Sequence, residues 1–319
     1  MNKAPAVSSL SYANKNRSHV LFEELFYVLL NRLSSGHKGS HKFRFKNKLL
    51  SIDASVIDLS LSLFDWADFR RTKGAVKLHL QLDHAGHLPS FAVVTEGKTH
   101  EVTVARKMRF ERGTIVAMDR GYIDYSWFER LSDDGVSFVT RMKSNAVYYV
   151  VENFALPHRR NLLSDQTIVF EREAKVLGSG GAEEAYLYRL VRVVDETSGE
   201  ILEFLTNNFT LSPATIAAIY KERWQIELFF KALKQNLKIK TFLGTSANAV
   251  KSQIWTALIA MLLIKYLKLK STYNWSLSNL VALLRMNLFV HRDLWSWLND
   301  PMRPPPDTIV NTQGSFEFG

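Results

Sequence analysis

The sequence predicts a mixed α/β fold, in which a group of short strands precedes a long helical region. Between residues 49 and 143, segments rich in β-branched residues alternate with turn-like segments such as "HAGH". From residue 212 onwards apolar residues recur at helical spacing, as in "LSPATIAAIY". The chain has 319 residues and is 46% hydrophobic, which is enough to bury a large core.

The predicted strands and helices between residues 49 and 143 follow one another in the order of a known fold. Five strands are predicted, at 49–59, 75–83, 88–97, 113–122 and 136–143. The first three are expected to be antiparallel, and the fourth, "GTIVAMDRGY", is apolar enough to be buried on both faces. A helix follows the fourth strand and ends at Gly135. Three strands, a helical stretch, a strand, a helix, a strand and a long helix is the order of an RNase H-like core, which is the fold class predicted.

The remaining segments surround or interrupt this core. Ser18 is expected to cap a helix that ends at Gly36. The basic segment "GHKGSHKFRFKNK" that follows is either a solvated linker or an arm that contacts DNA. The predicted divisions are 1–48, helical with a basic loop; 49–143, first part of the core; 144–211, a β-rich insertion; 212–270, the rest of the core; and 271–319, a helical segment and tail.

Composition limits the classes of function. Lys and Arg number 41 against 31 Asp and Glu, so the net charge is +10, which favours a polyanionic partner such as nucleic acid. Without cysteine there is no disulfide, thiolate zinc site or cysteine nucleophile, and a metal needs Asp, Glu or His ligands. The start shows no export signal, which predicts a cytoplasmic protein. The run "IWTALIAMLLI" is too short to cross a bilayer and predicts a buried helix.

Two acids stand in apolar strands, where a charge requires a reason. Asp53 lies inside the first strand, and Asp119 ends the fourth, a position where α/β proteins build sites. Asp53 has a structural alternative, pairing with a nearby lysine, and Asp58 is its competitor on the opposite face of a regular strand. Asp124 is the exposed alternative to Asp119.

A third acid lies in "YKERWQIELFFKALKQNLKIK", residues 220–240, which is predicted to be one helix. At about 100° per residue, one face spanning roughly 80° carries Tyr220, Arg223, Glu227, Lys231, Lys234 and Lys238. An apolar stripe lies beside this face. Pairing of Glu227 with Arg223 and Lys231 is the alternative to a functional role. One acid among four cations favours an external anion.

The segment "YKERWQIELFFKALK" resembles the Tyr, two residues, Arg, three residues, Glu, six residues, Lys signature of YREK-type DDE transposases, in the insertion sequence four (IS-four) family. "SIDASVIDL" and "VAMDRGYIDYSWF" resemble that family's two aspartate regions, and "RTKGAVKLHLQLD" resembles its lysine-rich strand. The resemblance extends from about residue 10 to residue 266. Relatives carry additional N-terminal residues, so a truncated copy is one interpretation of this chain.

The resemblance implies the roles of the site residues. Asp53, Asp119 and Glu227 would form the DDE triad and bind Mg²⁺ or Mn²⁺, as two ions. The expected DNA-binding residues are Tyr220, Arg223 and Lys234 from the signature, Lys231 and Lys238 from the helical geometry, and Lys73, Lys77 and Arg120 from the neighbouring blocks.

The expected function is that of an insertion-sequence transposase, which cleaves the ends of its element and joins them to target DNA. Its partners would be the terminal inverted repeats, the target DNA and a second copy of the chain on paired ends. Two alternatives remain: an RNase H-like nuclease without strand transfer, and a truncated, non-catalytic DNA-binding remnant.

Overall fold

The computed structural model describes residues 6–35, 41–60, 62–64, 66–70, 73–156, 161–171, 185–237 and 242–302. The chain divides into two compact units, Met1–Leu262 and Leu263–Gly319. The strands are β1 (Leu49–Leu59), β2 (Asp68–Arg70), β3 (Lys73–Asp83), β4 (Leu88–Glu96), β5 (Ile115–Met118), β6 (Ser137–Arg141), β7 (Tyr148–Asn153), β8 (Leu162–Phe170), β9 (Tyr188–Val194) and β10 (Ile201–Thr206). The helices are α1 (Val7–Asn16), α2 (Val20–Ser35), α3 (Glu101–Ala105), the 3-10 turn η1 (Arg120–Tyr122), α4 (Tyr125–Asp133), α6 (Pro213–Glu222), α7 (Trp224–Asn236), α8 (Ala247–Lys270), α9 (Leu277–Asn287) and α10 (Leu294–Asn299).

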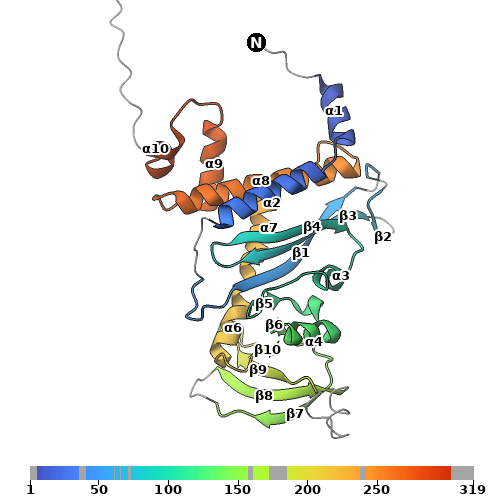
Figure 1. Cartoon of the computed structure of the whole chain (residues 1–319), viewed down its shortest axis with the longest axis vertical. Helices are drawn as coiled ribbons and strands as arrows, with labels where there is room; N and C mark the ends of the chain where they lie inside the picture. The colour runs from blue at the N-terminus through green and yellow to red at the C-terminus, as the bar shows by residue number, and fades with distance from the viewer. Residues whose placement is uncertain are drawn as a thin grey trace, which may run out of the picture. The chain divides into compact units, whose positions relative to one another are not determined.

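The ten strands of the described residues belong to one mixed sheet (Figure 1). Its order is β2-β3-β1-β5-β6-β10-β9-β8-β7. Strand β4 also pairs with β3, along the edge opposite to β1. β1, β3 and β4 form an antiparallel meander, whereas β5 runs parallel to both β1 and β6. The turn between β3 and β4 requires a positive φ of 116° at Gly86, which glycine adopts without steric cost. The predicted α/β class and the five predicted core strands are confirmed.

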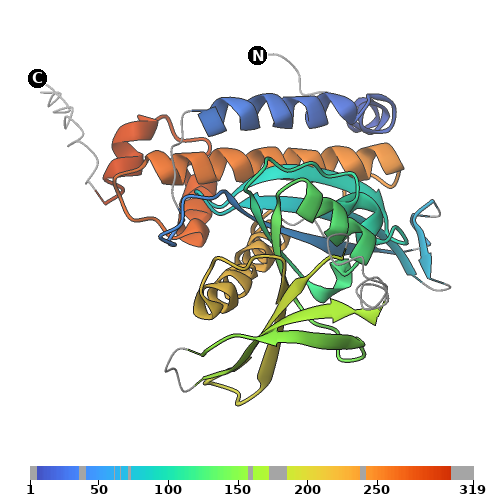
Figure 2. The same cartoon turned by 60° about the horizontal axis from the view of Figure 1, so that its bottom comes forward.

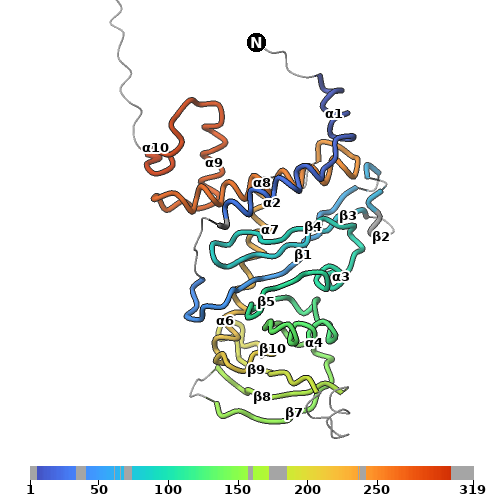
Figure 3. Tube along the Cα trace, viewed as in Figure 1, coloured from blue at the N-terminus to red at the C-terminus, as the bar shows by residue number. Residues whose placement is uncertain are grey.

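Strands β7 to β10, which lie within residues 144–211, extend this sheet (Figure 3). Within the described part of the segment, β7 to β10 form an antiparallel series, and β10 joins it to β6. The chain then returns from β10 to α6 beside the central strands. The β-rich character expected for this stretch is therefore present, as a continuation of the same sheet.

Two apolar layers cover the opposite faces of the central strands. One face carries α3 and α4, whose Val104, Trp127 and Phe128 belong to its buried cluster. The other face carries α6, through Ile216 and Ile219. Figure 2 shows α6 and α7 on one side of these strands and α3 and α4 on the other.

Polar side chains begin several helices as the sequence predicts. The Ser18 hydroxyl accepts a hydrogen bond from the Val20 N–H at the start of α2, and Ser212 caps α6. Asp124, the alternative to Asp119, accepts the Trp127 N–H as the cap of α4 and also pairs with Arg106. Asp124 therefore has a structural role.

The helix predicted over residues 220–240 differs from the observed one. It is interrupted at Arg223, where α6 ends and α7 begins, and α7 ends at Asn236. The N–H groups of Arg223 and Ile226 bond to carbonyls three residues earlier rather than four. The predicted continuous helix is therefore divided into two at Arg223, whose backbone nevertheless keeps helical dihedral angles.

The apolar run at 254–264 belongs to a longer helix than predicted, α8. By length and composition alone α8 could span a membrane, but half of its most apolar window is buried inside the protein. Its Trp255 contacts Phe26 of α2, with ring centroids 5.4 Å apart. These properties are those of a core helix.

The second unit has its own apolar cluster. Trp275, Leu280, Trp297 and Leu298 are buried together in it. The Trp275 indole N–H donates to the Leu298 carbonyl at 2.7 Å, which satisfies the polar end of a buried ring.

Candidate active site

Asp53 and Asp119 come directly after the last paired residues of two neighbouring parallel strands. That last register pair between β1 and β5 is Ile52↔Met118. Adjacent strands lie about 4.8 Å apart. The pairing therefore brings two acids that are distant in the sequence to the same place in the sheet.

The alternation of side chains along a strand decides which face these acids share. Asp53 lies four residues after Leu49, and Asp119 lies two residues after Ala117. Leu49 and Ala117 belong to the apolar cluster that α6 covers with Ile216. Both acids consequently lie toward the face of the sheet that carries α6 and α7.

Glu227 reaches the same place from α7. It stands in the first turn of this helix, where the partial positive charge of the N-terminus favours a carboxylate. The Arg223 guanidinium donates to Glu227 Oε1 at 2.6 Å, and its Nη1 lies 3.8 Å from Asp53 Oδ2. The Arg223 side chain is only 12% exposed, so a nearly buried cation connects the two acids.

Burial and repulsion between the acids make it unfavourable for all three carboxyl groups to be ionised together. Burial is the largest cause that raises the pKa of Asp53 to about 6. The Ala54 N–H and the Arg223 guanidinium lower this pKa, whereas Glu227 and Asp119 raise it further. Asp53 therefore interacts electrostatically with both of the other acids.

The donor chemistry of this set suits a divalent cation, because carboxylate oxygens are the ligands that Mg²⁺ prefers. Among the described residues, no three acidic or histidine side chains already surround one point at ligand distance. The Arg223 guanidinium instead supplies positive charge between Asp53 and Glu227. The acids fit a metal if Arg223 turns away from them.

A cleft of about 430 Å³ opens beside the acids and has cationic walls. Its lining includes Asp53, Glu227, Lys231 and Lys234. Lys231 is exposed, while the Lys234 ammonium donates to the Val56 carbonyl of β1 at 2.9 Å. An anion that enters this cleft would meet both lysines next to the acids.

Tyr220 lies at the edge of this region. Its ring is half-buried, 5.1 Å from the Phe204 ring, and the Arg223 guanidinium lies 5.3 Å from its centroid. Burial raises the pKa of Tyr220, so its hydroxyl stays protonated. Tyr220 thus supports the guanidinium that contacts the acids.

The other predicted DNA-binding residues differ in how they are placed. Arg120 is exposed and directly follows Asp119. Lys77 is buried, and its ammonium pairs with Glu101 at 2.8 Å, so this ammonium is engaged by α3. Lys73 begins β3, but its side chain lies outside the described structure, as does the whole of Lys238.

The sequence reasoning did not single out Tyr122. This side chain is 2% exposed, and its hydroxyl has no hydrogen-bond partner among the described residues. Burial raises its pKa well above the usual value, and Asp53 and Asp119 add to that effect. The "DRGY" block, which places Tyr122 three residues after Asp119, was the available signal.

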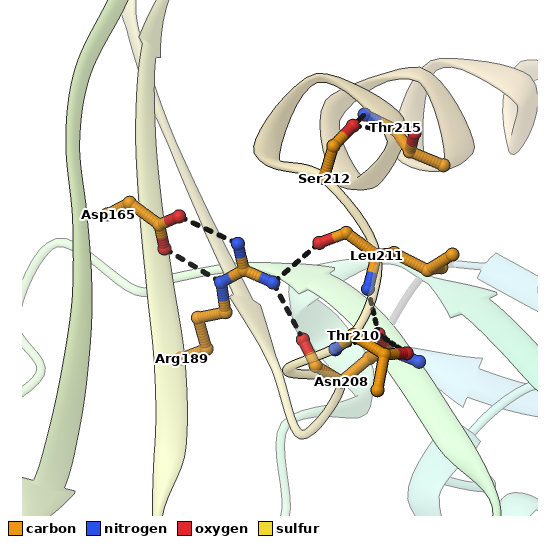
Figure 4. Close-up of polar contacts among 7 residues, drawn as sticks. All are labelled: Asp165, Arg189, Asn208, Thr210, Leu211, Ser212 and Thr215. Carbon is orange, nitrogen blue, oxygen red and sulfur yellow. Dashed lines mark hydrogen bonds and ion pairs between the residues drawn. The ribbon is translucent and has the colours of Figure 1, made fainter. Parts of the chain in front are cut away.

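A buried ion pair holds α6 in position (Figure 4). Arg189 on β9 makes two 2.7 Å hydrogen bonds to Asp165 on β8. Its remaining guanidinium nitrogen donates to the carbonyls of Asn208 and Leu211, just before the Ser212 cap. The strands of residues 144–211 are thereby joined to the start of the helix that leads to Arg223.

The family model described as "Transposase DDE domain" matches residues 44–263. The chain therefore belongs to this family of transposases. The IS-four resemblance inferred from the sequence is confirmed at this level.

Similar proteins are named as transposases. The match to y4zB of Sinorhizobium fredii is 29% identical and covers 95% of this chain and 82% of that protein. The transposase for insertion sequence element IS5377 of Geobacillus stearothermophilus is 28% identical, over 85% of this chain and 70% of that protein. The transposase for insertion sequence element IS4SA of Synechocystis sp. is 26% identical, over 82% of this chain and 71% of that protein.

Among solved structures, a chain of the piggyBac transposase synaptic complex with hairpin DNA is similar at a TM-score of 0.42. The sequence identity is 12%, and the alignment covers 84% of this chain and 60% of that chain.

Proposed function

We propose that this protein is a divalent-metal-dependent DNA transposase of an insertion sequence, which cleaves at its element ends and joins them to target DNA. The observation that carries the proposal is the convergence of Asp53, Asp119 and Glu227 beside a cleft with lysines in its wall. The strand order supports an RNase H-like core in which residues 144–211 are an insertion.

Asp53, Asp119 and Glu227 would hold the metal, as two ions of Mg²⁺ or Mn²⁺. Bound metal would activate a water or 3′-hydroxyl and stabilise the leaving oxygen of the phosphodiester. Binding of the DNA phosphates would be the role of three cations, Arg223, Lys231 and Lys234.

Those cations would hold the phosphates of the DNA next to the acids and offset their charge. Arg223 can do so only by exchanging its carboxylate partners for a phosphate, to which a guanidinium binds with similar geometry. The remaining predicted DNA contacts stay proposals, namely Tyr220 and Arg120 near the acids and Lys73 at the start of β3.

The test is cleavage of a duplex that carries an end of the element with its flanking DNA, in the presence of Mg²⁺. We expect Glu227→Gln to abolish nicking while DNA binding survives, because the variant loses a metal ligand but keeps every cation that would hold the phosphates. Glu152→Gln, at an exposed position of β7, is the matched control and should cut normally. Unchanged cleavage by Glu227→Gln would refute the assignment of the triad.

A second assay separates this enzyme from its alternatives. Pre-cut ends incubated with a target plasmid should yield joined products, which a nuclease lacking strand transfer cannot form. Binding without any cleavage by the unaltered chain would identify a DNA-binding remnant. Sedimentation with and without paired ends tests the proposed homodimer.

A further inference from the structure

The segment 41–48, "HKFRFKNK", alternates aromatic or imidazole rings with cations. In the structure, partly buried and exposed side chains alternate in the same way. His41, Phe43 and Phe45 are partly buried, whereas the intervening Lys42 and Arg44 are exposed. Lys46 and Lys48 continue the exposed set. We call residues 41–48 the basic strip.

The rings anchor the basic strip to the core. Phe43 and Phe45 stack with centroids 5.1 Å apart, and both pack against the apolar cluster that α6 covers. Because the two rings stack on each other and pack on this cluster, each is only partly exposed. The strip is therefore held in place, and what it offers to a partner is charge.

Hydrogen bonds fix the backbone of the same segment. His41 Nε2 lies 2.8 Å from the Asn47 carbonyl oxygen, and the Asn47 amide donates to the Gly113 carbonyl at 2.7 Å. The Lys48 carbonyl accepts the Ile115 N–H at 2.8 Å. A solvated linker would not need contacts of this kind, because it would gain nothing from a fixed position.

The charges of the basic strip are only partly neutralised. Lys42 pairs with Glu222, and Lys48 lies 3.6 Å from Glu111. Among the described residues neither Arg44 nor Lys46 has an ion pair. The Lys48–Glu111 pair joins two exposed side chains and is weak, so a phosphate can replace that carboxylate at little cost, whereas the Glu222 side chain is only 10% exposed and retains Lys42.

The pairing of Lys42 connects the strip to the candidate active site. Glu222 is the last residue of α6, and it directly precedes Arg223, which contacts Asp53 and Glu227. A groove of about 640 Å³ runs beside the strip and is lined by Arg44, Lys46 and Lys48 among other residues. Lys42 of the strip therefore pairs with the residue that directly precedes Arg223, the side chain that lies between Asp53 and Glu227.

We propose that the basic strip binds the sugar-phosphate backbone of duplex DNA next to the position that is cut. This inference rests on the proposed function for the identity of its ligand. The binding should depend little on base sequence, because the exposed side chains of the strip are its cations and Asn47, whose amide already donates to the Gly113 carbonyl.

The test is the salt dependence of duplex binding, measured in EDTA so that no cleavage occurs. The variant is Arg44→Gln with Lys46→Gln and Lys48→Gln, which leaves the Lys42 pair intact. Each lost phosphate contact lowers the slope of log K against log salt by about 0.9, so the slope should fall by about 2 to 3. The affinity should fall roughly tenfold or more, equally for an element end and a shuffled duplex.

The matched control carries three Lys→Gln changes at exposed positions outside the strip, namely Lys15, Lys98 and Lys107. It loses the same net charge and should keep nearly the full slope. Equal losses in both variants would overturn the proposal, and so would an unchanged slope in the strip variant with its Tm preserved. A chain that binds through the strip but never cuts in Mg²⁺ would contradict the proposed function alone.

Discussion

Asp53→Asn should make the metal-free protein more stable while removing its activity. Burial raises the pKa of Asp53 to about 6, from the usual 3.8. Well below pH 3.8 the acid is protonated in both the folded and the unfolded chain. As the pH rises toward 6, the unfolded chain releases this proton first, so the folded state loses stability.

The magnitude follows from the same two values. The difference between 3.8 and about 6 corresponds to about 3 kcal/mol, at about 1.4 kcal/mol for each pH unit. This cost is present almost in full above pH 6, is small at pH 4 and is absent only well below pH 3.8. Asparagine has the shape of aspartate without the charge, so Asp53→Asn should recover most of it. A gain of roughly 2 °C per kcal/mol gives a rise in Tm of about 5 °C.

Thermal unfolding in EDTA at pH 8 and at pH 4 measures this effect. We expect the Tm of the variant to exceed that of the wild type by about 5 °C at pH 8 and by much less at pH 4. Asp58→Asn, an exposed acid on the same strand, is the control and should change stability by less than about 0.5 kcal/mol. An Asp53→Asn protein that is no more stable than the wild type at pH 8 would refute the reasoning.

Two further changes test the cations at and behind the site. Arg223→Gln removes the cation between Asp53 and Glu227. Calorimetry without DNA should therefore show tighter Mn²⁺ binding, and DNA binding in EDTA should become weaker. A loss of Mn²⁺ binding would contradict this expectation. Asp165→Asn leaves the buried Arg189 without its charge partner and should lower the free energy of unfolding by about 3 to 5 kcal/mol in urea titrations. Glu203→Gln, in a more exposed pair, should cost less than about 1 kcal/mol, and equal costs would show that burial does not matter here.

Much of the central sheet could be predicted because its signals are local. The β-branched runs and the apolar segment before Asp119 identify strands without any knowledge of their partners. The same property made Asp53 and Asp119 conspicuous, since a charge within such a run is costly. The break at Arg223 could not be predicted in this way, because its backbone stays helical and only the hydrogen bonding changes.

Side-chain partners were the least predictable part of the candidate site. Lys77 looks like a surface cation in an alternating strand, yet its ammonium is buried against Glu101, 24 residues later in the chain. Arg223 was expected to face DNA, but in the structure it faces the acids. The basic segment before β1 left two interpretations open, and the packing of Phe43 and Phe45 is what distinguishes a fixed strip from a linker.

The sequence by itself indicated the class of fold, the family and a set of candidate acids and cations, because periodicity, composition and motif spacing are properties of the chain alone. Only the tertiary structure decided that Asp53 and Asp119 stand side by side, that Glu227 meets them through Arg223, and how much charge remains exposed. These features depend on strand register and burial, which arise when segments distant in the sequence pack together and exclude water.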